Sequence, residues 1–313
     1  MSVSIGIDIG GTKISVGLLN RAGDILYKKV FPTPKSGKDE VILLLKREIY
    51  KLMEWANHNR ITDIVGIGIG TAGQIDFQNG RVLSGTTNIH DWNNVELRKE
   101  MESSFQIPVW VDNDVNVLLI AEKYLGAAHG QDEVLCLALG TGVGGAVITN
   151  GEIVRGLFGA AAELGHISVD MNGPVCNCGF RGCLEMYSSG TGIARMMRDK
   201  KNSNIPFQSH EITSELVFDL YHQGNEEAKE VVETLITALT FGVVNCIHTF
   251  NPAMIILGGG VVEKGEWLIE LLKDKLKTLG LQSMVKPVKI VLAQLGSDSG
   301  LIGAGYQSFI YTI

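Results

Sequence analysis

The sequence predicts an α/β protein built from two domains. A chain of 313 residues is too long for one small core and suits two domains of ordinary size. Short apolar runs typical of buried strands alternate with segments whose apolar residues recur at helical spacing. The order strand, Gly-rich turn, strand occurs twice, at 4–20 and at 133–149, as a weak internal repeat. Two related α/β domains facing each other across a cleft would explain this repeat.

Composition and charge narrow the class of protein. Hydrophobic residues make up 45% of the chain, which is typical of a well-packed globular protein. The net charge of −7 gives no general attraction to nucleic-acid phosphates. No apolar run approaches the roughly 18 residues of a membrane span, and the N-terminal residues enter a strand-like pattern without a signal-peptide core. We therefore expect a cytoplasmic protein with no nucleic-acid or membrane partner.

The first half of the chain has the pattern of an α/β unit. Its hairpin at 4–20 is followed by a helical segment at 41–59 and by a buried strand at 63–73 that ends in a Gly-rich loop. A surface helix is expected at 95–105. The last segment, 107–114, is predicted to be a strand that ends in a polar cluster.

The second half repeats this alternation, beginning with its own hairpin. The later segments are a long apolar helix at 227–250, a strand at 253–260, a helix at 266–279, a strand at 286–296 and a closing helix at 297–313. No low-complexity linker separates the halves, so we place the boundary near 115–120. The prediction is a small α/β domain of residues 1–117, closed by the C-terminal helix 297–313, and a large α/β domain of residues 118–296.

Three Gly-rich turns follow predicted strands and begin at Gly10, Gly140 and Gly258. Without Cβ atoms, such turns let several backbone N–H groups point at one anion, although each alone is also compatible with a tight hairpin. Two of them carry a threonine on matched hairpins, which favours phosphate binding. They match neither the P-loop nor the dinucleotide-binding turn between a strand and a helix. The candidate phosphate-binding residues are Gly10, Gly11, Thr12, Lys13, Thr141, Gly142, Gly144, Gly145, Gly258, Gly259 and Gly260.

Acidic residues lie at the ends of two predicted strands. Asp8 precedes the first Gly-rich turn, where it could be an ordinary turn residue or could hold Mg²⁺ through water. The stretch VDNDVN at 111–116 could cap the helix that follows it. Alternatively, one of its Asp side chains accepts the proton of a substrate hydroxyl while Asn113 orients the same substrate. A carboxylate ionised at neutral pH suffices, because phosphoryl transfer has a loose transition state and needs little early proton removal.

A histidine and three cysteines have the composition of a zinc site. Glu163 and His166 are three residues apart in the stretch AELGH, and ten residues after His166 begins the stretch CNCGFRGCLE. A disulfide is disfavoured by the reducing compartment and by the short C-x-C spacing. One His and three Cys instead complete a tetrahedral structural zinc site, which we favour over a redox pair. The predicted ligands are His166, Cys176, Cys178 and Cys183, in a knuckle spanning 166–183. The remaining residues of this kind, Cys136, Cys246 and His248, are predicted to be packed core.

Six motifs in order resemble one family of proteins. The stretches DIGGTK, GTAGQID, NDVN, GTGVGG, AELGH and CNCGFRGCLE resemble the ROK family of sugar kinases and related repressors, from residue 5 to about 190. Weaker support continues to the end through LGGG and GLIGAG. The resemblance implies a two-domain ribonuclease-H-like fold of the actin/hexokinase type, with ATP and sugar in a central cleft.

The resemblance also implies a role for each motif residue. Asp114 would be the catalytic base for the sugar 6-hydroxyl. Asp8 and Thr12 would serve the metal and phosphate side, and the second and third Gly-rich turns would bind the phosphates and lie beside the adenosine. The residues implied to hold the sugar are Gly73, Asn88, Asn113, Asp114, Glu163, His166 and Glu185. ATP, Mg²⁺ and structural Zn²⁺ are the implied cofactors, and a homodimer is the implied assembly.

Three positions depart from the commonest family pattern, and they bear on which sugar fits. Ala162 stands where the family usually has Gly, Val115 where it has Ala, and Ala146 where it has a third Gly of the phosphate loop. We expect glucose as the substrate. The alternatives are N-acetylmannosamine, N-acetylglucosamine, fructose, mannose or a β-glucoside. A sugar-responsive repressor is disfavoured because Asp8 leaves no room for a preceding DNA-binding domain, and an inactive sugar sensor is disfavoured by the intact Asp114.

Overall fold

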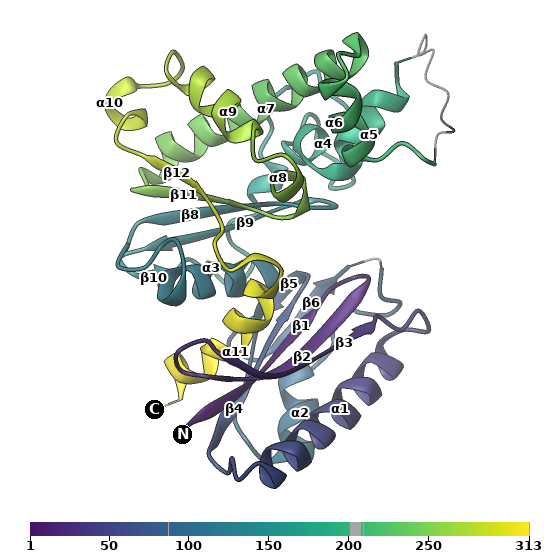
Figure 1. The fold of residues 1–313 in the computed structure, drawn as a ribbon, viewed down its shortest axis with the longest axis vertical. Coiled ribbons are helices and arrows are strands. Elements are labelled where there is room, and N and C mark those ends of the chain that lie inside the picture. Colours follow the sequence, from purple (N-terminus) through teal and green to yellow (C-terminus); the bar gives the residue numbers. More distant parts are fainter. Residues whose placement is uncertain (87, 201–207, 209, 313) are drawn as a thin grey trace. The chain divides into compact units, whose positions relative to one another are not determined.

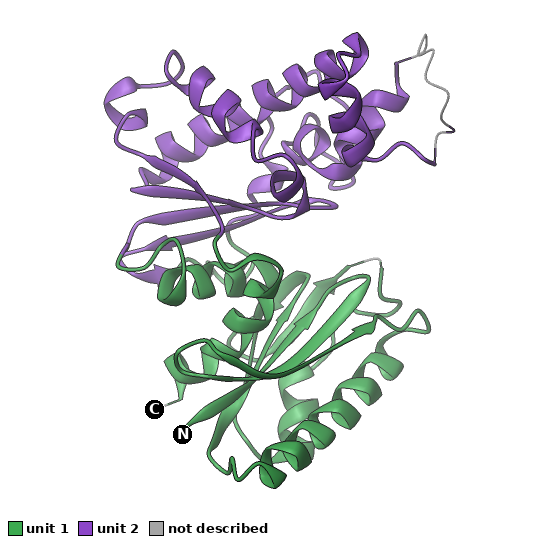
Figure 2. Cartoon of the chain, viewed as in Figure 1, with its two compact units in different colours: residues 1–130, 153–161, 294–313 green, residues 131–152, 162–293 purple. Residues whose placement is uncertain are grey.

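The computed structural model describes residues 1–86, 88–200, 208 and 210–312 (Figure 1). These form two compact units, shown in Figure 2. The first unit comprises residues 1–130, 153–161 and 294–313, and the second comprises 131–152 and 162–293. The boundary that the sequence placed at 117/118 falls inside helix α3, Asp114–Leu125, all of which belongs to the first unit. The short segment 153–161 also joins the first unit although its flanking residues belong to the second.

The first unit is built on a five-stranded mixed sheet of order β3-β2-β1-β4-β7. Strands β1 and β2 form the predicted antiparallel hairpin, and β4 and β7 continue the sheet in parallel. The strands are β1 (Val3–Ile9), β2 (Lys13–Asn20), β3 (Ile25–Pro32), β4 (Ile64–Thr71) and β7 (Val109–Asn113), with a separate two-stranded sheet of β5 (Gly73–Asp76) and β6 (Arg81–Gly85). The helices are α1 (Lys38–His58), α2 (Leu97–Phe105), α3 and α11 (Ser299–Tyr311).

Strand β1 shows why both faces of this sheet are buried. Its odd-numbered residues Ile5, Ile7 and Ile9 pack in one core cluster with residues of α1. Its even-numbered positions face α11, where a Cβ on Gly6 would lie 2.3 Å from the carbonyl oxygen of Leu301. The missing side chain therefore allows backbone-to-backbone packing of strand and helix. This packing ties the C-terminal helix to the strand that carries Asp8.

The second unit repeats the arrangement with a sheet of order β10-β9-β8-β11-β12. Strands β8 and β9 are antiparallel, and β11 and β12 extend the sheet in parallel, as β4 and β7 do in the first unit. The predicted internal repeat is therefore a repeat of topology. Its strands are β8 (Val134–Leu139), β9 (Val143–Thr149), β10 (Glu152–Ile153), β11 (Met254–Gly258) and β12 (Lys289–Leu292). Its helices are α4 (Glu185–Ser188), α5 (Gly190–Arg198), α6 (Ser214–His222), α7 (Glu226–Phe250), α8 (Gly260–Lys264), α9 (Leu268–Leu276) and α10 (Gln282–Val285).

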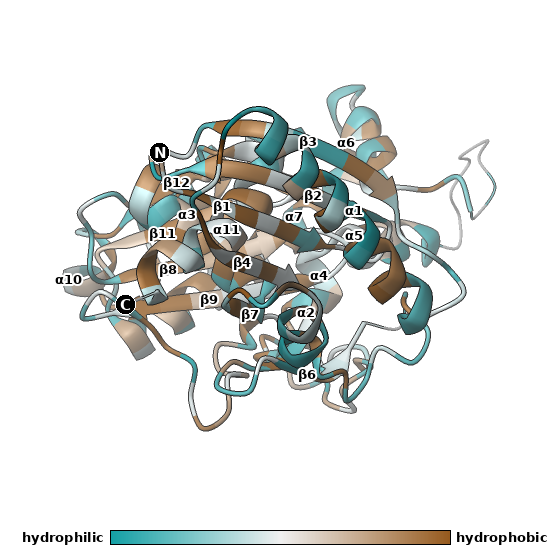
Figure 3. Cartoon of the chain, turned by 90° about the horizontal axis from the view of Figure 1, so that it is seen from below, coloured by the Kyte–Doolittle hydropathy of each residue, from teal (hydrophilic) through white to brown (hydrophobic). Residues whose placement is uncertain are grey.

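Helix α7 departs from one expectation. Its 25 residues are long and apolar enough to cross a membrane by length and composition, whereas the sequence analysis expected no such run. Leu235 and Val243 are fully buried, and 61% of the most apolar window is buried inside the protein. Figure 3 shows that the strands of the sheets are mostly hydrophobic, whereas α2 is largely hydrophilic. We therefore interpret α7 as the core helix of the second unit.

Candidate active site and metal centre

The first Gly-rich turn joins β1 to β2 and packs against a predicted sugar-binding residue. The N–H of Gly10 donates to the carbonyl oxygen of Lys13 at 2.9 Å, which closes the turn. A Cβ on Gly11 would lie 2.4 Å from Nδ2 of Asn88. Gly11 must therefore remain without a side chain for Asn88 to occupy its place. The structure thus brings together a candidate phosphate loop and a candidate sugar ligand that are 77 positions apart in the chain.

Asp8 has an unusual electrostatic environment at the end of β1. Burial raises the pKa of Asp8 to about 6, and the neighbouring Asp114 carboxylate adds to the shift. The positive charge of Lys13 opposes this increase in pKa without cancelling it. Asp8 therefore ionises less readily than an ordinary aspartate, and it lies beside a second acid. A divalent cation would relieve this repulsion. The local chemistry therefore fits the predicted magnesium role of Asp8.

The polar cluster at the end of β7 is an ordered junction between strand and helix. The side chain of Asn113 caps α3 by accepting from the N–H of Val115 at 2.8 Å. Its Nδ2 donates to the carbonyl oxygen of Gly73 at 3.0 Å, which joins two predicted sugar-side residues. Asp114 is the first residue of α3. The capping role and the substrate role that the sequence left open are thus compatible, because the cap fixes the backbone from which Asp114 projects.

Arg155 is a residue that the sequence analysis missed. Its guanidinium group pairs with the fully buried carboxylate of Asp112, directly before Asn113. A lone arginine outside every motif gives no signal of such a partner. The available hint was Asp112 itself, an acid that directly follows three apolar residues of a predicted strand.

The second Gly-rich turn joins β8 to β9 in the second unit and packs against Glu185. The Glu185 carboxylate accepts a hydrogen bond from the N–H of Val143 at 3.2 Å. A Cβ on Gly142 would lie 2.4 Å from the same carboxylate, whereas a Cβ on Gly140 would meet no atom within 4 Å. As in the first unit, a candidate phosphate loop adjoins a candidate sugar ligand.

The third glycine run lies beside the second. Gly258 ends β11, and Gly260 begins the short helix α8. Gly259 has a φ of 89°, and a Cβ there would lie 2.5 Å from the carbonyl oxygen of Leu139, the residue before Gly140. The structure thus gathers two of the three predicted nucleotide-side turns at one end of the second sheet.

Glu163 and His166 lie on one tight turn. The N–H of His166 donates to the carbonyl oxygen of Glu163 at 3.0 Å, and Leu164–His166 form a 3₁₀ turn. Although its surface is largely accessible, Glu163 has a raised pKa, because surrounding protein desolvates its carboxylate and the Glu185 carboxylate adds repulsion, while His166 opposes the shift. Ala162 has a φ of 65°, a conformation that favours glycine. This strain lies where the sequence departs from the usual Gly.

The four predicted metal ligands form one cluster. His166, Cys176, Cys178 and Cys183 offer ligand atoms that all lie within 4.8 Å of one another. The Sγ atoms of Cys178 and Cys183 are 3.6 Å apart, as are Sγ of Cys176 and Nδ1 of His166. A tetrahedral zinc site with Zn–S bonds near 2.3 Å has S–S edges of about 3.8 Å. These separations fit zinc and are far too long for a disulfide bond, so the structure bears out the zinc prediction.

The chemistry of the cluster also calls for a cation. Burial raises the pKa of Cys183 to about 12, and the thiol groups of Cys178 and Cys176 add to the shift. A metal-bound thiol is deprotonated, and the metal charge offsets the cost of the buried thiolate. Gly182 closes the knuckle with a φ of 62°, and a Cβ there would lie 1.7 Å from the carbonyl oxygen of Asp170. The knuckle geometry therefore requires its glycine.

Of the three residues predicted to be packed core, two are buried and one is exposed. Cys136 and Cys246 are buried, as expected. The prediction was wrong for His248, which is exposed on α7 and accepts a hydrogen bond from the N–H of Leu281 at 3.0 Å. A position near a helix end can face solvent even where the surrounding sequence is apolar.

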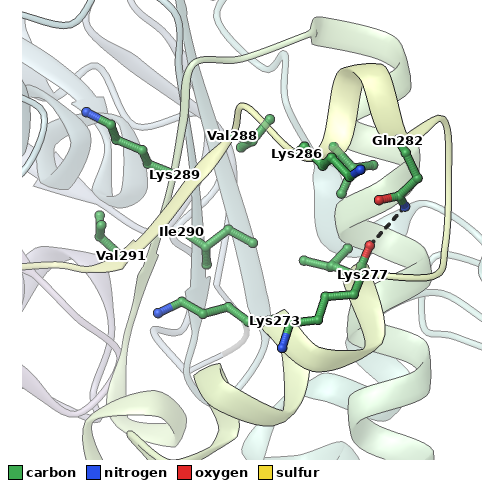
Figure 4. A pocket seen from close by; sticks show the side chains of 10 residues that line it. Lys273, Lys277, Gln282, Lys286, Val288, Lys289, Ile290 and Val291 are labelled. Atoms are coloured by element: carbon green, nitrogen blue, oxygen red, sulfur yellow. Dashed lines mark hydrogen bonds between the residues drawn. The ribbon is translucent and has the colours of Figure 1, made fainter.

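A cavity of about 520 Å³ in the second unit contains none of the predicted site residues. Figure 4 shows its lining side chains, which come from α9, α10 and β12. Two of its four lysines, Lys273 and Lys277, are paired with acids of their own helix. This cavity therefore does not coincide with the predicted site.

Comparisons with known proteins agree with the motifs. The model of the ROK family matches residues 4–307. A glucokinase of Thermotoga maritima is 36% identical over 308 residues, covering 96% of this chain and 95% of the relative. An N-acetyl-D-glucosamine kinase of Haemophilus influenzae is 31% identical, covering 96% and 97%. The structure of a ROK family glucokinase from Streptomyces griseus in complex with glucose and AMPPNP has a TM-score of 0.81 and 31% identity, covering 98% and 99%. The predicted fold class is confirmed.

Proposed function

Because the chain belongs to the ROK family, we propose that it is an ATP-dependent hexose kinase that transfers the γ-phosphate of ATP to the 6-hydroxyl of glucose. The similarity to glucokinases over nearly the whole chain is the observation that carries this proposal. The side chains required by the chemistry are also present. Asp114 begins α3 beside Asp8, and both Gly-Thr turns keep their glycines.

Asp114 is the proposed catalytic base. Its carboxylate accepts the proton of the sugar 6-hydroxyl as that oxygen attacks the γ-phosphate. Proton removal is late in a loose phosphoryl-transfer transition state, so an ordinary carboxylate is basic enough to accept the proton, provided that it is correctly oriented. The Asn113 cap, which fixes the start of α3, supplies this orientation from the protein side. Correct placement of the reacting groups can lower the barrier by roughly 7–11 kcal/mol.

The glycine turns and Asp8 are proposed to serve ATP and Mg²⁺. The backbone N–H groups of Gly10–Lys13 in one unit and of Thr141–Gly145 in the other bind phosphate oxygens, and Gly258–Gly260 lie beside the adenosine. When bound, Mg²⁺ would supply positive charge to the transferring phosphoryl group. Asp8 would hold this ion through water, which is consistent with its position beside a second carboxylate.

The zinc knuckle is proposed to brace the sugar-side residues of the second unit. Nδ1 of His166 lies in the ligand cluster, which leaves Nε2 to bind a sugar hydroxyl. Cys176 lies 3.8 Å from the Glu185 carboxylate through its Sγ atom, so the knuckle also contacts the second sugar-side acid. With Gly73, Asn88, Asn113 and Glu163, these residues would hold the remaining hydroxyls.

The identity of the hexose is the sharpest test of the proposal. A coupled ADP-release assay would compare kcat/KM for glucose, N-acetylglucosamine, N-acetylmannosamine, fructose, mannose and a β-glucoside. We expect glucose to have the highest value. A higher kcat/KM for N-acetylglucosamine would favour the second candidate function, which the similarity to an N-acetyl-D-glucosamine kinase supports. Sequence-specific DNA binding without turnover of any sugar would instead support a repressor.

Assembly and location remain proposals. We propose a homodimer, which light scattering would test against the 33.9 kDa mass of one chain. We also propose a cytoplasmic location, where ATP is available and the four-ligand cluster would stay reduced.

A further inference from the structure

A buried ion pair involves Asp112, two residues before the proposed catalytic base Asp114. The Asp112 carboxylate is fully buried, and one of its oxygens accepts from Nε and Nη2 of Arg155 at 3.1 and 2.8 Å. The Arg155 side chain is 17% exposed. A carboxylate buried without a partner is costly, so this pairing offsets the cost of burying Asp112 inside the first unit.

The other carboxylate oxygen of Asp112 holds the junction between β7 and α3. It accepts from the backbone N–H of Asn113 at 2.8 Å and from Nδ2 of Asn116 at 2.7 Å. Asn116 lies in the first turn of α3, and Asn113 is its cap. Asp112 therefore holds the backbone of Asn113 and the side chain of Asn116, which lie on either side of Asp114, although it is itself out of reach of solvent.

Arg155 is in turn fixed by aromatic groups of the first unit. Its Nη2 donates to the hydroxyl of Tyr311 at 2.8 Å, and its guanidinium carbon lies 3.7 Å from the centre of the Phe77 ring. A planar guanidinium can donate to a carboxylate, donate to a hydroxyl and stack on a ring at once, whereas a lysine ammonium cannot. The geometry at this position is therefore specific to arginine.

The segment that carries Arg155 is anchored at a second point. Gly159 has a φ of 111°, and a Cβ there would lie 2.0 Å from the carbonyl oxygen of Ile75 in β5. The N–H of Gly159 donates to the carbonyl oxygen of Arg155 at 3.0 Å, which folds the segment back on itself. Residues 153–161 are thus seated in the first unit, and the chain then runs on to Glu163 and His166.

We propose that Arg155 is a positioning residue for phosphoryl transfer, acting through Asp112 to aim Asn113 and Asp114. This inference rests on the proposed function, because it assigns no contact between Arg155 and the substrate. It predicts that loss of Arg155 lowers kcat more than it raises either KM. A misplacement of about 1 Å at a reacting group can cost roughly a hundredfold in rate.

The test compares two arginine variants of the same unit. In Arg155→Met we expect kcat to fall at least about thirtyfold, with KM for glucose and ATP within about threefold of wild type. The matched control is Arg98→Met, which removes an arginine whose hydrogen bonds to the described part of the chain all go to the backbone carbonyls of Val109, Gln78 and Phe77. It should keep kcat within about threefold of wild type. Added guanidinium should restore part of the activity of Arg155→Ala, and Arg155→Lys should recover less than the wild-type rate.

A measurement without catalysis separates this inference from the proposed function. Amide hydrogen exchange should accelerate at residues 112–116 in Arg155→Met, while exchange in β11 stays unchanged. Unaltered exchange at 112–116, or a kcat equal to that of Arg98→Met, would overturn the positioning role. If the wild-type chain phosphorylates no sugar, the proposed function fails. The exchange result would still decide whether Arg155 orders the junction.

Discussion

The two units share a sheet topology but carry their polar residues in different places. In the first, Asp8, Asn113 and Asp114 lie at the ends of β1 and β7, where sheet hydrogen bonds and the α3 cap fix the backbone. In the second, the corresponding outer strand β12 is followed directly by Ala293 and Gln294, and Glu163, His166 and Glu185 lie on an insertion after β10. Strand ends are rigid without further support, whereas a long insertion needs a brace. We propose that the histidine and cysteine cluster supplies that brace.

The largest expected effect is on the strand-end side of this comparison. Asp114→Asn should lower kcat by about 10³-fold, because the amide cannot accept the hydroxyl proton, while the KM for sugar stays within a few fold. Steady-state kinetics with glucose would measure both values. A kcat near that of wild type would remove Asp114 as the base.

Replacing Asp8 should lower the activity of the protein but raise its stability. Asp8→Asn should lower kcat/KM for MgATP about a hundredfold and yet stabilise the fold at pH 7–8. The folded pKa of about 6 lies above the ordinary value of 3.8, so the ionised Asp8 destabilises the folded state above pH 6, and this cost disappears as pH falls toward 4. Because a difference of one in pKa corresponds to about 1.36 kcal/mol, Asp8→Asn should raise the free energy of unfolding by an amount on the order of 1–3 kcal/mol.

Urea unfolding at pH 4 and pH 8 would check this assignment. The stabilisation by Asp8→Asn should be large at pH 8 and small at pH 4, because near pH 4 Asp8 is protonated in the folded state and about half protonated in the unfolded state. Equal stabilisation at both pH values would contradict the raised pKa.

The brace in the second unit should affect sugar binding more than ATP binding. Cys178→Ser, or removal of zinc by a chelator, should raise KM for glucose at least tenfold and KM for ATP less than threefold. The expected size follows from metal sites in general, where loss of the groups that orient the ligands typically costs 10–100-fold in metal affinity or activity. Zinc content would be measured alongside the kinetics. Equal changes in both KM values, or full activity in the zinc-free protein, would contradict the bracing role.

The smallest effect is expected from disturbing a contact that occurs in both units, the one between a Gly-rich turn and a candidate sugar-binding side chain. Gly142→Ala places a Cβ 2.4 Å from the Glu185 carboxylate and should raise KM for glucose about five- to tenfold, of the order expected for 1 kcal/mol or slightly more. Gly140→Ala is the matched control, because its Cβ meets no atom within 4 Å. Isothermal titration calorimetry would compare the affinities of the two variants for glucose. Equal affinities would show that Glu185 moves without consequence for the sugar.

The sequence predicted what depends on residues close together along the chain. Each hairpin, each glycine turn and the His and Cys ligand set lies within about twenty residues, and their spacing alone constrains the backbone. The apolar pattern of the strands also predicted the α/β class and the internal repeat. The zinc cluster is the strongest example, because the ligand spacing specifies the chemistry almost without reference to the rest of the fold.

Only the tertiary structure decided which distant residues meet. The pairs Gly11 with Asn88, Gly142 with Glu185 and Asp112 with Arg155 join positions more than forty residues apart. It also decided that α3 and residues 153–161 belong to the first unit. The physical reason is that close packing and buried charge select partners by position in space, whereas a sequence pattern records only which face of an element is apolar.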